Sequence, residues 1–168
     1  MNNKTAYMGI LLAFALILSY IESLLPLSFG IPGIKLGLAN LAVLLGICLI
    51  GYRETLLLAV SKAVICGFLF GNLSMIVYSL AGAVLSFVIM AVMVKSGRFH
   101  LPVVSMAGGV MHNMGQVLTA YLVIKTYGLL YYVPILILAG IITGTLIGIA
   151  ASLVMPYLRK IIGREENL

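Results

Sequence analysis

The sequence contains no aspartate and no tryptophan, and charged residues make up only 8% of its 168 residues. An ordinary soluble domain has about 25% charged and about 45–50% apolar residues. This chain is 63% hydrophobic, and its mean hydropathy is +1.23. The composition therefore excludes a water-soluble domain and indicates a protein whose solvent is the lipid bilayer.

Residues and motifs that serve catalysis are also scarce. The acidic residues are all glutamates, at Glu22, Glu54, Glu165 and Glu166. Aspartate-rich magnesium–diphosphate motifs are thus missing, as is a G-x-x-x-x-G-K-[ST] loop for ATP. Cys48 and Cys66 stand alone in apolar runs, and no metal-ligand spacing or nucleophile motif is present. We therefore expect no enzyme activity, no metal and no cofactor in this chain.

Long apolar runs fill most of the sequence. A membrane-spanning helix needs about 20 mainly apolar residues, and charges, prolines and glycine turns divide the chain into six runs. The predicted helices cover residues 5–25, 36–51, 55–71, 73–94, 102–124 and 129–156. No cleavage pattern follows the first run before Glu22, so we expect that helix to be retained. We predict an all-α integral membrane protein, one domain of six transmembrane helices over residues 1–168.

The basic residues indicate the orientation of these helices. Seven of them fall on one side of the predicted membrane, at Lys4, Arg53, Lys95, Arg98, Arg159, Lys160 and Arg164. Only Lys35 and Lys125 fall on the other side. Short cytoplasmic loops carry an excess of Lys and Arg, so both termini are predicted to be cytoplasmic. The basic residues form no stripe with interleaved aromatics, which argues against a nucleic-acid partner.

Several polar side chains interrupt the apolar runs. A charge at the centre of a membrane helix costs about 2.5–3.5 kcal/mol on insertion scales, so each such residue needs a reason to be there. The candidate ligand-binding residues are Glu22, Lys35, Asn40, Asn72, His112, Asn113 and Gln116. With both termini in the cytoplasm, these residues all map to the outer half of the membrane.

Three of these candidates share one arc of the fifth predicted helix. His112 and Gln116 are four residues apart, and Asn113 lies about 100° round the helix from His112. Two readings are open, a hydrogen-bonded stripe that only holds the bundle together and a wall of a ligand site. We favour the ligand site, because three adjacent polar side chains exceed what packing needs.

The other polar residues also have two readings. Glu22 either lies at the interface or pairs with Lys35, and Asn40 and Asn72 either cap helix ends or contact a ligand. Lys62, in the third run, is within about 10 Å of the cytoplasmic end. Its long side chain can therefore snorkel inward or be buried.

Small residues repeat along two of the predicted helices. Gly140, Gly144, Gly148 and Ser152 recur at every fourth position, and Gly9 and Ala13 have the same spacing in the first run. Such spacing lets membrane helices approach closely. It serves either packing within the chain or docking of another subunit.

Two motifs resemble a known family. The runs Ile31–Asn40, IPGIKLGLAN, and Gly108–Gln116, GGVMHNMGQ, resemble the family described both as "Gx transporter" and as "heptaprenyl diphosphate synthase component I". The resemblance covers essentially the whole chain. This family looks like part of the substrate-binding S components of energy-coupling-factor (ECF) transporters.

The resemblance implies a multi-pass protein of a bacterial plasma membrane that binds a small vitamin- or cofactor-like molecule from outside. It implies that the loop between the first two helices acts as a lid, with Pro26, Gly30, Pro32 and Gly33. It also implies that Gly9 and Ala13 dock on a membrane-embedded T component, which is coupled to cytoplasmic ATPase subunits. ATP would then be used by these partners. The related proteins usually have two alanines at the docking positions, and Gly9 departs from that pattern.

Three hypotheses on function follow. The first is an S component of an ECF-type, ATP-driven uptake transporter. The alternative is a non-catalytic membrane accessory subunit of a polyprenyl (heptaprenyl) diphosphate synthase, whose magnesium–diphosphate chemistry this chain does not supply. The third is an autonomous secondary transporter, driven by an ion gradient.

Overall fold

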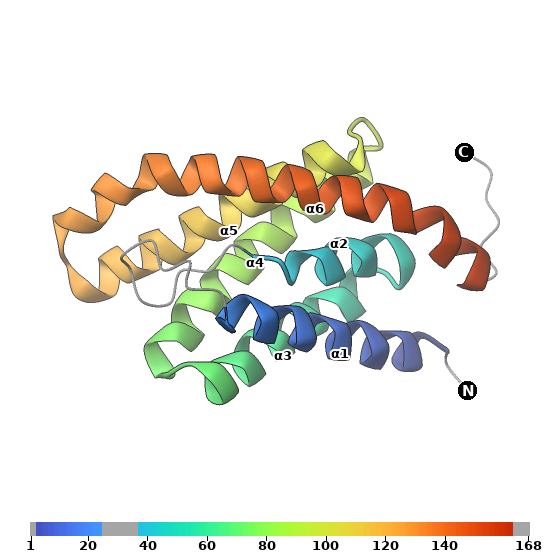
Figure 1. The fold of residues 1–168 in the computed structure, drawn as a ribbon, viewed down its shortest axis with the longest axis horizontal. Coiled ribbons are helices and arrows are strands. Elements are labelled where there is room, and N and C mark those ends of the chain that lie inside the picture. Colours follow the sequence, from blue (N-terminus) through green and yellow to red (C-terminus); the bar gives the residue numbers. More distant parts are fainter. Residues whose placement is uncertain (1–2, 25–36, 163–168) are drawn as a thin grey trace.

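The computed structural model describes residues 3–24 and 37–162, and this part of the chain is all-helical, as predicted. Its elements in chain order are α1 (Asn3–Leu24), α2 (Asn40–Leu49), α3 (Tyr52–Phe70), α4 (Leu73–Ser96), α5 (Leu101–Ile124), the 3₁₀ helix η1 (Tyr127–Tyr132) and α6 (Val133–Ile162). α1 and α6 run along opposite sides of an elongated bundle, and α2 lies between them (Figure 1). Each of the six apolar runs therefore contains one α-helix.

The largest differences between the observed and the predicted helix ends are in the second and the last run. α2 begins at Asn40 rather than at residue 36, because Gly37 has a left-handed φ of +83°, which a helix does not allow. The last run begins as a 3₁₀ helix, and α6 continues through Pro156 to Ile162 instead of ending at the proline. A proline inside a membrane helix is tolerated where the surrounding structure satisfies the freed backbone groups.

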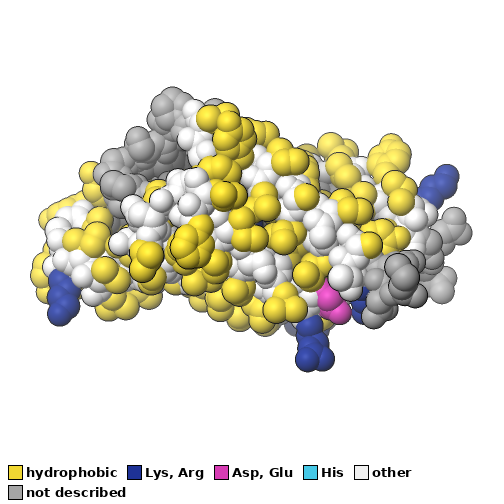
Figure 2. All heavy atoms as spheres, turned by 90° about the horizontal axis from the view of Figure 1, so that it is seen from below, with side chains coloured by type: hydrophobic (Ala, Val, Ile, Leu, Met, Phe, Trp, Pro, Cys, Tyr) yellow, Lys and Arg dark blue, Asp and Glu magenta, His cyan; other side chains and the backbone are white. Residues whose placement is uncertain are grey.

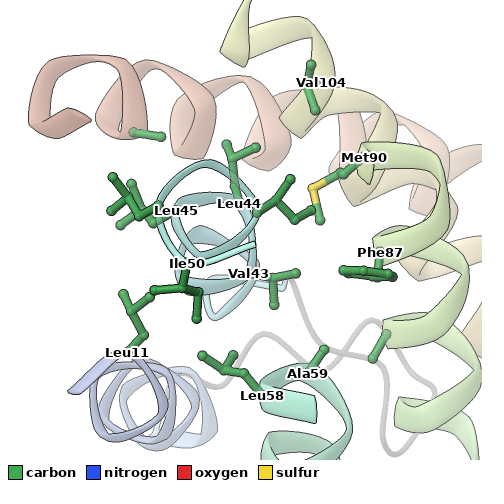
Figure 3. Packing of buried hydrophobic residues seen from close by; sticks show 14 of the residues in the cluster. Leu11, Val43, Leu44, Leu45, Ile50, Leu58, Ala59, Phe87, Met90 and Val104 are labelled. Atoms are coloured by element: carbon green, nitrogen blue, oxygen red, sulfur yellow. The ribbon is translucent and has the colours of Figure 1, made fainter. Parts of the chain in front are cut away.

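The core of the bundle surrounds α2. This helix contacts each of the other five α-helices, and Leu44 is completely buried. Leu58 of α3, Met90 of α4 and Val104 of α5 converge on the same cluster (Figure 3). With 10 residues α2 is about 15 Å long, half of the roughly 30 Å hydrocarbon core. It is thus an internal helix of the bundle that is shorter than the hydrocarbon core is thick.

The glycines of α6 pack against α5. A Cβ atom at Gly144 would lie 2.7 Å from both Met106 Cα and Ser105 O, and one at Gly140 would lie 2.8 Å from Val110 N. These are backbone atoms, which cannot turn aside as a flexible side chain does. Of the two readings of the glycine repeat on α6, the structure therefore supports packing within the chain.

The outer surface of the bundle is mainly apolar. Large hydrophobic side chains are exposed on every long helix, and they are spread along the whole length of the face shown in Figure 2. Soluble monomers rarely expose such continuous apolar surface. Among the described residues three stretches are long and apolar enough to cross a membrane, at Lys4–Leu24, Leu73–Ser96 and Tyr127–Ile162. The fold is thus that of a membrane-associated helical bundle.

Candidate ligand site

A small polar cavity lies inside the bundle, where four helices meet. Its lining residues come from α1, the turn before α2, α3, α4 and α5, and they are Ser19, Glu22, Gly37, Lys62, Ala63, Cys66, Ser79 and His112. The cavity has a volume of about 10 Å³, which is about the room that one water molecule needs. The side chains of a glutamate, a lysine and a histidine thus line one small cavity.

Glu22 connects the end of α1 to the beginning of α2. Its Oε1 atom accepts a hydrogen bond from the backbone N–H of Gly37, with an N···O distance of 2.6 Å. The left-handed φ of +83° favours glycine at position 37, and a Cβ atom there would lie 2.9 Å from Asn40 Nδ2. Glu22 is buried rather than placed at the interface. Its side chain therefore holds the turn at Gly37, which lines the cavity and precedes α2.

Lys62 is buried at the cavity, with 7% of its surface exposed. Of the two readings of this residue, the structure therefore supports burial rather than snorkelling to the cytoplasmic end. Sequence reasoning left Lys62 out of the candidate ligand-binding residues for that reason. The available signal was its position in the middle of an apolar run, since an intramembrane lysine usually has an oppositely charged partner or a function.

The three polar side chains of α5 contact two different neighbouring helices. His112 lines the cavity, and both His112 and Gln116 pack against Gly82 of α4, where a Cβ atom would lie 2.8 Å from Gln116 Cγ. Asn113 points the other way, because its Nδ2 donates a hydrogen bond to the Leu136 carbonyl of α6 at 2.8 Å. The structure therefore places only His112 at the cavity, while Gln116 and Asn113 sit in helix–helix contacts.

Asn40 is buried beside Gly37, and its Nδ2 atom has no hydrogen-bond partner in the part of the chain that the structure describes. The same holds for the Oδ1 atom of Asn113. A buried polar atom without a partner is unfavourable by about 1–3 kcal/mol, and such atoms are usually satisfied by water or a ligand. The described residues thus leave one polar atom of each of these two amides without a hydrogen bond.

Asn72 lies apart from this group. It is exposed at the start of α4, where its Oδ1 accepts a hydrogen bond from Met75 N at 2.9 Å. Of its two readings, helix capping is the one that the structure displays. Lys35 and the predicted lid residues Pro26, Gly30, Pro32 and Gly33 lie outside the described residues.

The predicted docking residues lie on the outer face of α1. Gly9 and Ala13 are both exposed, and nothing lies within 4 Å of the position that a Cβ atom at Gly9 would take. α1 packs on α2 and α3 through its opposite face. Within the described residues no group of three or more His, Cys, Asp or Glu side chains is placed to hold a metal ion.

Fold and cavity together define a class of protein, a membrane-associated helical bundle with a polar interior site. The chain belongs to the family described as heptaprenyl diphosphate synthase component I, whose model matches residues 11–154. This is the family that the two motifs indicated. Searches of curated proteins and of solved structures gave no match. The family description agrees with the accessory-subunit hypothesis better than with the uptake hypothesis.

Proposed function

We propose that this chain is a non-catalytic membrane subunit that binds a small molecule in its polar cavity and works with other subunits. The observation that carries the proposal is the convergence of Glu22, Lys62 and His112 on one cavity inside an otherwise apolar bundle. Ionisable residues within membrane segments are unfavourable unless they pair or serve a function. Because the cavity has room for about one water molecule, a larger ligand requires the surrounding helices to move apart.

In the first candidate function, the chain captures a solute for an ECF-type uptake transporter. The buried site and the exposed Gly9 and Ala13 support this role, because one offers a ligand site and the other a close-packing face for a membrane partner. The T component and the ATPase subunits would supply the energy. The ligand class is a small polar or anionic molecule, which Lys62 and His112 are suited to bind.

The family description favours a second candidate, a membrane accessory subunit of a heptaprenyl diphosphate synthase. The chain contains no aspartate, so the magnesium–diphosphate chemistry would belong to a partner. In this case the polar side chains around the cavity would stabilise the bundle, or the cavity would bind a regulatory molecule.

Association experiments separate the two candidates. The tagged chain is purified in mild detergent from its host, and the proteins that accompany it are identified. The uptake candidate predicts that a T component and ATPases are present in the eluate. A Gly9→Leu variant should fold normally but should no longer copurify with these partners. The accessory candidate predicts a prenyl diphosphate synthase, whose activity on reconstitution depends on this chain. Purification without either set of partners would count against both.

We also propose that both termini are cytoplasmic and that the helices cross the membrane in six passes, with α2 as the internal one. The charge asymmetry supports this orientation. Arg53 and Lys95 lie near one end of the helices, and Lys125 at the junction of α5 and η1 lies near the other. Positive residues favour the cytoplasmic side. The plasma membrane of a bacterium is the location that this proposal implies.

A further inference from the structure

The ionisable side chains that line the polar cavity balance each other in charge. Of the described lining residues, Glu22 of α1 can carry a negative charge and Lys62 of α3 a positive one. A proton that passes from Lys62 to Glu22 changes both groups but leaves their sum at zero. Histidine side chains are ordinarily uncharged above about pH 7, so His112 leaves this sum unchanged. The described lining of the cavity therefore has no net charge.

Burial makes this charge balance important for binding. Only 8% of the surface of Glu22 and 7% of that of Lys62 is exposed, so these groups are screened much less than surface charges. Charges interact more strongly in such an interior than in water, and a buried charge without a counter-charge is strongly unfavourable. A ligand ion that entered the cavity would add one such charge. A ligand without net charge would leave the balance intact.

The lining side chains match a ligand that has both hydrogen-bond donors and acceptors. A charged lysine side chain only donates, whereas a charged glutamate only accepts and has lone pairs for several donors. Glu22 accepts from the Gly37 N–H with its Oε1 atom, and a carboxylate can take further donors beside that one. Ser19 and Ser79 contribute hydroxyl groups, which both donate and accept. A small polar group with a donor and an acceptor therefore fits this lining.

Asn40 adds a donor beside the cavity. Its side chain is buried, and its Nδ2 atom has no hydrogen-bond partner in the described part of the chain. This atom lies next to Gly37, which lines the cavity, because a Cβ atom at Gly37 would be 2.9 Å from it. An acceptor on a ligand that reached Gly37 would thus give the Asn40 amide the partner that buried polar groups normally have.

We propose that the polar cavity selects a small molecule without net charge, which donates to Glu22 and accepts from Lys62 and Asn40. This inference rests on the proposed function, because it concerns the ligand of the same cavity, and it narrows the ligand class to molecules without net charge. A carboxamide meets the requirement with one uncharged group. An amino-acid zwitterion meets it with two charges that cancel. The charge balance of Glu22 and Lys62 carries the assignment, and both kinds of molecule satisfy it.

Thermal unfolding of the full chain in mild detergent tests the proposal, at about pH 7.5, where histidine and cysteine side chains are ordinarily uncharged. The chain is titrated with acetamide, glycine, acetate or ethylammonium, which are similar in size. The rise of the unfolding midpoint with concentration gives the apparent dissociation constant of each probe. We expect acetamide or glycine to bind at least about tenfold more tightly than acetate and ethylammonium. Tighter binding of acetamide than of glycine assigns an uncharged ligand, and the reverse assigns a zwitterion.

Variants of the two ionisable side chains should change which probe binds most tightly. Glu22→Gln keeps an oxygen that can accept from the Gly37 N–H but leaves the charge of Lys62 unbalanced, so acetate should become the tightest probe. Lys62→Met should favour ethylammonium, and the double variant should again favour the probes without net charge. The control is Lys125→Gln, which removes a charge from an exposed position outside the cavity. It should keep the original preference.

Circular dichroism checks the folding of each variant, and Glu22→Gln alone is sufficient if the Lys62 variants do not fold. Tighter binding of acetate or ethylammonium to the unchanged chain would overturn the charge selection but leave the proposed function in place. So would an unchanged preference in Glu22→Gln. Binding of none of the four probes to the unchanged chain would contradict the proposed function as well.

Discussion

At the residue scale, the geometry of the cavity depends on a turn whose backbone conformation favours glycine. Gly37 combines a φ of +83° with an N–H that donates to Glu22. Asn40 begins α2 three residues later, and the side chains of Asn40 and His112 both lie within 4 Å of the position that a Cβ atom at Gly37 would take. A residue with a side chain at this position is strained twice, by its backbone conformation and by its contact with the Asn40 amide.

Substituting Gly37→Ala should therefore lower the free energy of unfolding by about 1–3 kcal/mol. The measurement is denaturant unfolding in mild detergent micelles, followed by circular dichroism. Gly128→Ala is the control, because a Cβ atom at Gly128 would lie 3.7 Å from its nearest neighbour and the residue has no positive φ. Equal stability of the two variants would show that the turn at Gly37 is not under this constraint.

Glu22 and Lys62 should be energetically coupled, because they face the same cavity from α1 and α3. In a double-mutant cycle with Glu22→Gln and Lys62→Met, the destabilisations caused by the two single changes should add up to more than the destabilisation of the double variant. Groups that share a network show coupling of about 0.5–3 kcal/mol. The same unfolding assay measures it. Additivity within about 0.5 kcal/mol would mean that the two side chains do not interact.

At the element scale, features that depend on local spacing could be predicted from the sequence, whereas contacts between helices could not. The all-helical fold and the polar stripe of α5 follow from apolar runs and from the i, i+4 relation of His112 and Gln116, which a sequence displays directly. The burial of Lys62 depends on α1 lying beside α3, and no local pattern encodes that neighbour. Likewise Asn113 turns to α6 because of the Leu136 carbonyl, a contact across 23 residues.

The glycines of α6 determine how closely it approaches α5. Gly144→Leu should destabilise the isolated chain by about 1–3 kcal/mol, the usual cost of overpacking, because Met106 and Ser105 meet it with backbone atoms. Thermal unfolding in detergent measures the change. Gly9→Leu makes the same substitution at an exposed site with nothing within 4 Å and should leave the midpoint unchanged. A similar decrease in both variants would contradict close α5–α6 packing as the cause.

At the scale of the whole molecule, the proposed orientation in the membrane rests on the positions of the basic residues. In a variant without Cys48 and Cys66, a cysteine is introduced at Ser96, the last residue of α4, or at Thr126, between α5 and η1; both positions are exposed. A membrane-impermeant maleimide should label Thr126→Cys in intact cells and Ser96→Cys only after permeabilisation. Labelling of Ser96→Cys in intact cells would reverse the orientation, and labelling of both would contradict the proposed passes.

The account as a whole depends on a ligand in the polar cavity. Its most direct test is native mass spectrometry of the full chain, purified from its host in mild detergent, to detect a retained small molecule. We predict one small polar molecule per chain, lost or weakened at least tenfold in Lys62→Met and His112→Ala. It should be retained in Lys125→Gln, which removes a charge from an exposed position outside the cavity. Absence of any small molecule, or equal retention in all of these variants, would contradict the proposed ligand site.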